Sequence, residues 1–102
     1  MYEITYFIEA EDDLANLPDE ILSEVMDYIE KYKINPYQYG KKLYNYKDTK
    51  LEGYFATYVA NATYRIVYSV ENGVTKIVEV VAIGKREEKE VYLEAHKRIS
   101  QK

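Results

Sequence analysis

Cysteine is absent from the sequence, histidine occurs once, and no apolar run approaches the ~20 residues that a membrane-spanning helix needs. Without cysteine the chain can have no thiol nucleophile, no disulfide framework and no Cys/His zinc site. The N-terminus also lacks the basic and apolar regions of a secretory signal peptide. We therefore expect a cytoplasmic protein without a metal or other cofactor, whose chemistry comes from Arg, Lys, Tyr, Asp, Glu or the one histidine.

Proline and glycine are also scarce, with two and four residues among 102. The sequence shows no linker, internal repeat or low-complexity segment. Its 47% apolar and 31% charged residues are typical of an ordinary globular protein. These features predict one domain over residues 1–102, which is long enough to bury a hydrophobic core.

Positive charge is missing from the first part of the chain. Residues 1–30 contain ten acidic residues and no Lys or Arg, whereas residues 31–102 hold all fourteen basic residues against eight acidic ones. The net charge of −4 therefore conceals an acidic first third and a basic remainder. Either the basic part faces phosphate while the acidic part is turned away, or both are ordinary solvated surface.

Hydrophobic spacing predicts an α+β fold with the element order β-α-α-β-β-β-α. The expected strands are 2–8, 54–59, 63–70 and 75–83, and the expected helices are 9–16, 19–33 and 87–99. The last three strands should form an antiparallel meander, in which Asn72-Gly73 suits a tight turn with positive φ. The first two helices should form an antiparallel hairpin, and all helices should pack on one face of the sheet. Residues 37–50 form a connector rich in tyrosine and lysine, with no clear period.

One arginine lies inside an otherwise apolar strand. Arg65 belongs to the stretch YRIVY at 64–68, and alternation places it on the face opposite Tyr64, Ile66 and Tyr68. If those three side chains face the helices, Arg65 faces the open side of the sheet, where a cation can meet a ligand. The alternative is a surface arginine paired with a carboxylate across the strands.

A second group of candidates lies where the last strand meets the final helix. Lys85 and Arg86 end the strand, and acidic residues begin the helix, where they complement the helix dipole. Tyr92 borders the apolar stripe of the helix and can reach the face that carries Arg65, although such a tyrosine often serves packing alone. His96 lies one turn further on and suits proton transfer, but a single helical histidine is usually plain surface.

Taken together, these motifs resemble the RelE/ParE family of toxins. The matching motifs are Leu17-Pro18, Asn35-Pro36, Gly40-Lys41-Lys42-Leu43, the strand at 64–68 and the segment GKREEKEVY at 84–92. The last of these is similar to the RelE branch in particular. The resemblance implies a small twisted antiparallel sheet with an N-terminal helical hairpin and a C-terminal helix. It also implies a toxin that enters the ribosomal A site, cleaves the mRNA there and pairs with a cognate antitoxin protein.

The resemblance assigns roles residue by residue. It implies that Arg65, Arg86 and Tyr92 are catalytic, and that Tyr58, Lys85 and Lys89 contact RNA. RelE enzymes carry two lysines at alternate positions of the preceding strand, and the matching positions here are Ala56 and Tyr58.

Three functions stay open from the sequence. The chain could be a ribosome-dependent mRNA endonuclease, a ParE-like inhibitor of DNA gyrase that needs no lysine pair, or a catalytically weakened relative that acts by protein binding. The C-terminal segment favours the first, because its arginine and tyrosine match the RelE active site.

Overall fold

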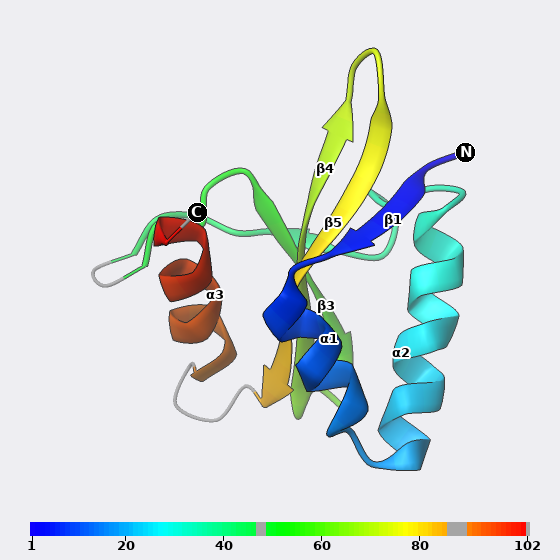
Figure 1. The fold of residues 1–102 in the computed structure, drawn as a ribbon, viewed down its shortest axis with the longest axis vertical. Coiled ribbons are helices and arrows are strands. Elements are labelled where there is room, and N and C mark those ends of the chain that lie inside the picture. The colour runs from blue at the N-terminus through cyan, green and yellow to red at the C-terminus, as the bar shows by residue number, and fades with distance from the viewer. Residues whose placement is uncertain (47–48, 86–89, 102) are drawn as a thin grey trace.

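The structure is a computed structural model that describes residues 1–46, 49–85 and 90–101 (Figure 1). Its elements follow in the order β1 (Glu3–Tyr6), α1 (Ile8–Ala15), α2 (Asp19–Tyr32), β2 (Lys41–Lys42), β3 (Tyr54–Val59), β4 (Tyr64–Asn72), β5 (Lys76–Lys85) and α3 (Glu90–Ser100). The predicted α+β order is confirmed. The structure adds the short strand β2, which was not predicted because two residues are too few to show an alternating pattern. Within the described ranges, no helix is both long and apolar enough to cross a membrane.

The strands form a five-stranded sheet in the order β1-β5-β4-β3-β2. Strands β3, β4 and β5 form the predicted antiparallel meander, and β2 pairs antiparallel with β3. The expectation of a wholly antiparallel sheet was wrong for β1, which runs parallel to β5. Alternation of side chains indicates that a segment is a strand but does not indicate the direction of its neighbour, so the sequence carried no signal for this pairing.

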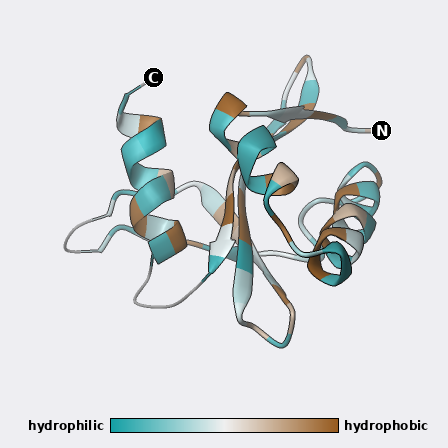
Figure 2. Cartoon of the chain, turned by 60° about the horizontal axis from the view of Figure 1, so that its bottom comes forward, coloured by the Kyte–Doolittle hydropathy of each residue, from teal (hydrophilic) through white to brown (hydrophobic). Residues whose placement is uncertain are grey.

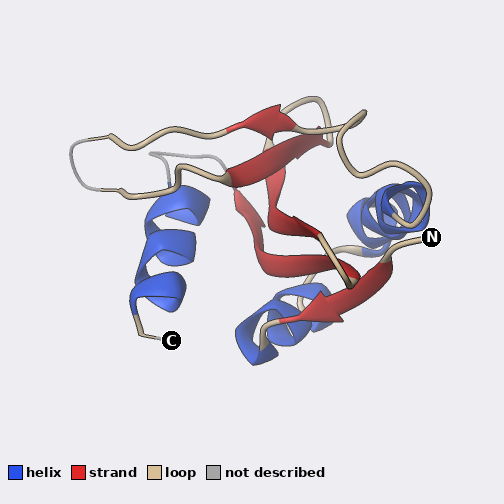
Figure 3. Ribbon diagram, turned by 90° about the horizontal axis from the view of Figure 1, so that it is seen from above, coloured by secondary structure: helices blue, strands red, loops and turns tan. Residues whose placement is uncertain are grey.

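Helices cover both faces of the sheet, which corrects the prediction that all of them pack on one face. Figure 3 shows α3 on one side and α1 and α2 away from it on the other. One core cluster joins α1 and α2 to Ile66 and Tyr68 of β4, and a second joins α3 to Val67 of the same strand. Because successive residues of a strand point to opposite faces, β4 can supply apolar side chains to both layers.

Helix α2 forms because its apolar residues align on one stripe. Val25, Ile29 and Tyr32 are buried against the sheet, and Figure 2 shows brown and teal residues alternating around this helix. Asp19 and Glu20 occupy its first turn, where negative charge complements the helix dipole. Helix α1 precedes it and runs in roughly the opposite direction, as predicted (Figure 1).

The unusual backbone lies in the turn between β3 and β4. Ala60, Asn61 and Ala62 all have positive φ, at 52°, 54° and 69°. The prediction of positive φ at Asn72-Gly73 was wrong, since neither residue has it. Left-handed conformations are unfavourable for residues with a Cβ, so the β3–β4 turn must be held by contacts with its surroundings.

Candidate functional site

Arg65 is buried near the start of β4, with 3% of its surface exposed. It lies on the face opposite Ile66, as alternation predicted, but this face is not open, because α3 and the side chains around it cover it. No carboxylate of the described residues forms an ion pair with its guanidinium. The expected exposed site and the alternative of a paired surface arginine are therefore both replaced by a buried cation held by neutral groups.

Tyr92 of α3 is one of those groups. The Nε of Arg65 donates a hydrogen bond of 3.1 Å to the Tyr92 hydroxyl, across 27 positions of sequence. Because the tyrosine oxygen accepts this bond, its own hydrogen remains available for a further acceptor. The structure thus brings together two residues that the sequence singled out separately.

Tyr58 of β3 is the third member of this cluster. It lies directly opposite Arg65 in the β3–β4 register, and its ring centroid is 3.6 Å from the guanidinium carbon of Arg65. The side chain is 40% exposed, so the ring shields the guanidinium from one side and still meets solvent. Arg65 consequently covers one face of the ring, which leaves at most one face for a stacked nucleotide base.

The turn between β3 and β4 also holds Arg65 in place. Nη1 of Arg65 donates to the carbonyl oxygens of Ala62 and Tyr64. The turn is held in place by Glu24 of α2, whose Oε1 accepts a hydrogen bond of 3.1 Å from the Ala60 backbone N–H. Among the described residues no group accepts a hydrogen bond from Nη2 of Arg65.

Lys41 is a member of the cluster that the sequence analysis did not select. Its Nζ lies 4.8 Å from the centroid of the Tyr58 ring. Strand β2 places it opposite Ala56, one of the two positions where a lysine was missing. Its only signal in the sequence was membership of the matching motif at 40–43, because the register of a two-residue strand cannot be read from a pattern.

The remaining candidates are not gathered here. Lys85 pairs with Tyr64 in the β4–β5 register, which places it on the face opposite Arg65. Arg86 and Lys89 lie outside the described residues. His96 has a structural contact, since its Nδ1 accepts a hydrogen bond of 3.0 Å from the Lys50 backbone N–H.

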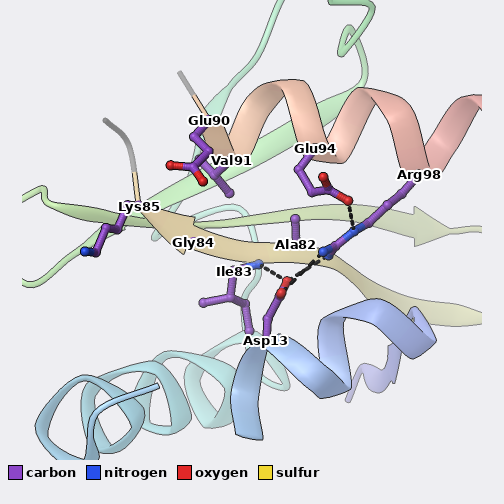
Figure 4. A pocket seen from close by; sticks show the side chains of 9 residues that line it. All are labelled: Asp13, Ala82, Ile83, Gly84, Lys85, Glu90, Val91, Glu94 and Arg98. Atoms are coloured by element: carbon purple, nitrogen blue, oxygen red, sulfur yellow. Dashed lines mark hydrogen bonds and ion pairs between the residues drawn. The ribbon is translucent and has the colours of Figure 1, made fainter. Parts of the chain in front are cut away.

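A separate polar cluster fastens α3 to the rest of the fold (Figure 4). Arg98 donates hydrogen bonds to the Asp13 carboxylate of α1 at 2.7 and 3.3 Å, to Glu94 at 3.0 Å and to the Val81 carbonyl at 2.8 Å. The other bond to Asp13 comes from the Ile83 backbone N–H, at 3.0 Å. Burial would lower the pKa of Arg98, but its hydrogen bonds and charge interactions with Asp13 and Glu94 raise it overall. Asp13, Glu94 and Arg98 line the pocket of about 310 Å³ beside this cluster, and these three side chains already bind one another.

The cluster of Arg65, Tyr92, Tyr58 and Lys41 is suited to an anion. It combines a buried guanidinium, an exposed ammonium and a tyrosine hydroxyl on one face of the sheet. No group of three or more His, Cys, Asp or Glu side chains in the described parts of the chain is arranged to hold a metal ion. Charge stabilisation and hydrogen bonding to a phosphate are therefore the chemistry that these side chains can provide.

Comparison with known proteins shows which solved structures this fold is similar to. No protein-family model matches the chain, and no curated protein matches it. Solved structures do. A double arginine-to-alanine variant of the E. coli toxin RelE in the free state has a TM-score of 0.75 and 26% identity, over 96% of this chain and 97% of that chain. The toxin–antitoxin complex RelBE2 from Mycobacterium tuberculosis has a chain with a TM-score of 0.68 and 26% identity, over 83% of this chain and 98% of that one.

A more distant likeness extends to a YoeB/ParE toxin from Agrobacterium tumefaciens. Its TM-score is 0.69 over 84% of this chain and 99% of that chain, at 19% identity, which shows a shared fold alone. The RelE matches are closer in sequence and span nearly the whole of both partners in the E. coli case. This chain is therefore similar to RelE toxins in its fold over nearly its whole length, and it also shares the RelE-like segment at 84–92.

Proposed function

We propose that this chain is the toxin of a type II toxin–antitoxin pair and that it cleaves mRNA in the ribosomal A site. The observation that carries the proposal is the contact of Arg65 with both Tyr58 and Tyr92. Strands β3 and β4 and helix α3 bring these three side chains together from distant parts of the sequence, on a RelE-like fold. A cluster of this kind has no need of a metal ion to bind phosphate.

The reaction proposed is cleavage by the RNA's own 2′-hydroxyl. The 2′-oxygen loses its proton and attacks the adjacent phosphorus, the bond from phosphorus to the 5′-oxygen breaks, and that oxygen takes up a proton. Negative charge grows on the phosphate oxygens in between, and Arg65 stabilises it through Nη2 and through its positive field. The Tyr92 hydroxyl, oriented by Arg65, donates to the same phosphate.

Arg65 can make fewer direct contacts with the phosphate than an exposed arginine could. Its Nε and Nη1 are already engaged with Tyr92 and with the turn carbonyls. A bidentate phosphate contact would require some of these bonds to break, so Arg65 acts mainly by holding Tyr92 and Tyr58 in place. Direct bidentate contact is proposed for Arg86, and RNA contacts for Lys85 and Lys89, on the family resemblance alone.

The proposed partners are a cognate antitoxin, the ribosome and its mRNA. The Mycobacterium tuberculosis relative is a toxin–antitoxin complex, which supports an antitoxin for this chain. The basic region from residue 31 onward suits acidic side chains of such a partner, and it suits ribosomal RNA when the partner is absent. The acidic residues 1–30 are proposed to point away from RNA.

The proposal can be tested by comparing Tyr92→Phe with the unsubstituted chain in a translation assay with primer extension on the mRNA. Tyr92→Phe removes one hydroxyl and keeps the ring, and we expect A-site cleavage to fall about 10²-fold, as for loss of one donor to a developing oxyanion. Tyr28→Phe is the matched control, because Tyr28 lies on α2 in the other core cluster and should leave cleavage unchanged.

Two results would contradict this function. If the unsubstituted chain inhibits growth while primer extension finds no cut in the A site, a ParE-like action on DNA gyrase becomes the better reading. If expression of the chain without an antitoxin has no effect on growth or translation, a role in protein binding alone remains.

A further inference from the structure

Strand β2 brings a cation to the candidate site from the motif at 40–43, to which the sequence assigned no site residue. The register pairs Lys41 with Ala56, and Ala56 shares its face of β3 with Tyr58, two residues further on. Lys41 therefore extends over the face that carries Arg65, and its ammonium lies 4.8 Å from the Tyr58 ring centroid. The ring is contacted from one neighbouring strand by Lys41 and from the other by Arg65.

The cations of Lys41 and Arg65 lie close together, and no carboxylate in the described part of the chain is ion-paired with either of them. From their distances of 4.8 and 3.6 Å to the centroid of the shared ring, the ammonium of Lys41 and the guanidinium carbon of Arg65 are at most about 8.4 Å apart, which is roughly one Debye length at physiological salt. Their fields therefore add at the exposed side of Tyr58, and an anion bound there is stabilised by both.

Ala56 explains why the cation comes from β2. Its side chain is buried, with 1% of the residue exposed, and it is the residue of β3 that pairs directly with Lys41 of β2. Because alanine has a small side chain, the longer side chain of Lys41 on the neighbouring strand can extend over this part of β3. The ring of Tyr58 then holds the ammonium by a cation–π contact, which restricts a side chain that would otherwise be mobile on an edge strand.

We propose that Lys41 is a phosphate-binding residue of this site and that, with Arg65, it holds a phosphodiester of single-stranded RNA beside Tyr58. This inference rests on the proposed function for its choice of RNA as the ligand. Proteins bind single-stranded nucleic acids with aromatic side chains that stack on bases and with cations that bind the phosphate backbone. Here the partly exposed ring of Tyr58 lies beside the ammonium of Lys41. Lys41 binds the phosphate and neutralises part of its charge, and the Tyr92 hydroxyl keeps its hydrogen bond with Arg65.

Lys42 provides a matched control inside the same strand. It is the next residue, carries the same charge and is also exposed. It pairs with Phe55, which packs in the other core cluster, so it lies on the opposite face of the sheet. Removal of either lysine changes the net charge by the same amount, and only their position relative to Arg65 differs.

The test is the affinity of the isolated chain for a short fluorescein-labelled single-stranded oligoribonucleotide, measured by anisotropy over a range of salt concentrations. Lys41→Met is expected to weaken binding at low salt on the order of tenfold and to reduce the slope of log affinity against log salt by about 0.7. Lys42→Met should weaken it less than about twofold. Lys41→Arg should keep most of the affinity, because it keeps the charge.

The inference is overturned if Lys41→Met and Lys42→Met weaken binding equally, since Lys41 would then contribute only general surface charge. It is also overturned if the unsubstituted chain binds the oligoribonucleotide at no salt concentration. Failure of the proposed function looks different, because it is read from the mRNA cut in translation and not from anisotropy. A chain that cuts no mRNA but loses RNA binding in Lys41→Met alone would refute the cleavage and keep the phosphate site.

Discussion

Replacement of Asp13 tests how far one carboxylate holds the third helix to the fold. Asp13 accepts hydrogen bonds from Arg98 of α3 and from the backbone N–H of Ile83 in β5 (Figure 4). Asp13→Ala removes all of these acceptors in one step. Since Tyr92 lies on the same helix as Arg98, the change also loosens the element that presents the Tyr92 hydroxyl to the site.

The expected loss of stability depends on which groups keep a hydrogen-bond partner when the Asp13 carboxylate is removed. Arg98 retains Glu94 and the Val81 carbonyl, so its charge is not left without acceptors. The Ile83 N–H, by contrast, loses its side-chain acceptor in a region that is largely closed to water. Breaking a buried pair costs about 3–5 kcal/mol, and the 21% exposure of the Asp13 side chain argues for the lower end. We therefore expect Asp13→Ala to lower the free energy of unfolding by roughly 3 kcal/mol, a large part of the ~5–10 kcal/mol typical of such a domain.

The measurement is urea unfolding at neutral pH, followed by circular dichroism. Asp12→Ala is the control, because Asp12 is the exposed neighbour on the same helix and its removal changes the net charge equally. That control should change the free energy of unfolding by less than about 0.5 kcal/mol. Asp13→Asn should fall between the two, since it keeps an acceptor for Ile83 and loses the charge. An equal, small effect of Asp13→Ala and Asp12→Ala would show that Glu94 and Val81 suffice for Arg98 and that our reasoning about the cluster is wrong.

Three further perturbations follow from the backbone and from buried groups. Burial raises the pKa of Tyr68 to about 12, so the folded state keeps this proton where the unfolded chain loses it above about pH 10. Stability from Tyr68 is therefore complete below pH 10 and should fall by roughly 2–3 kcal/mol between pH 10 and 12 in alkaline urea titrations, with a flatter profile for Tyr68→Phe. Ala62→Gly should raise the thermal midpoint, because it relieves a left-handed residue at φ 69°, and an unchanged or lower midpoint would argue against strain there. Gly40→Ala should cost about 1–3 kcal/mol, because its Cβ would lie 2.1 Å from the Tyr68 hydroxyl, whereas Gly73→Ala, with open space around it, should be mild in the same assay.

Much of the fold was predictable because the helices and long strands carry strong hydrophobic patterns. Helices α2 and α3 were predicted from apolar stripes at helical spacing, and the residues at these positions, Val25 and Ile29 in α2 and Val91 and Ala95 in α3, are buried. The side of the sheet that α3 covers was predicted wrongly, although a signal existed. In β5 the residues Val80, Val81, Ala82 and Ile83 form a continuous apolar run, which is typical of a strand covered on both faces. Alternation correctly predicted that Arg65 lies on the face opposite Ile66. The assumption that this face is not covered by a helix was wrong.

The candidate site was predictable only in part, because its contacts depend on register. The hydrogen bond from Arg65 to Tyr92 joins two residues chosen from separate motifs, so each motif indicated one half of the pair. The approach of Lys41 depends on its pairing with Ala56 across a strand of two residues. Pairing that short leaves no pattern in the sequence, and the connector that contains it shows none.

The parallel pairing of β1 with β5 has a consequence for the order in which the molecule can fold. In the described sheet β1 lies at one edge and has β5 as its neighbour, and Asp13 of α1 bonds to β5 as well. The first elements to be synthesised therefore find their place only after the chain has been made through Lys85. The meander of β3, β4 and β5 contains contacts between near neighbours in sequence and can form before the N-terminal segment docks. Folding that begins in this meander and ends with β1 would leave the acidic N-terminal segment exposed the longest, and its high charge would keep that late-docking segment from associating with others like it.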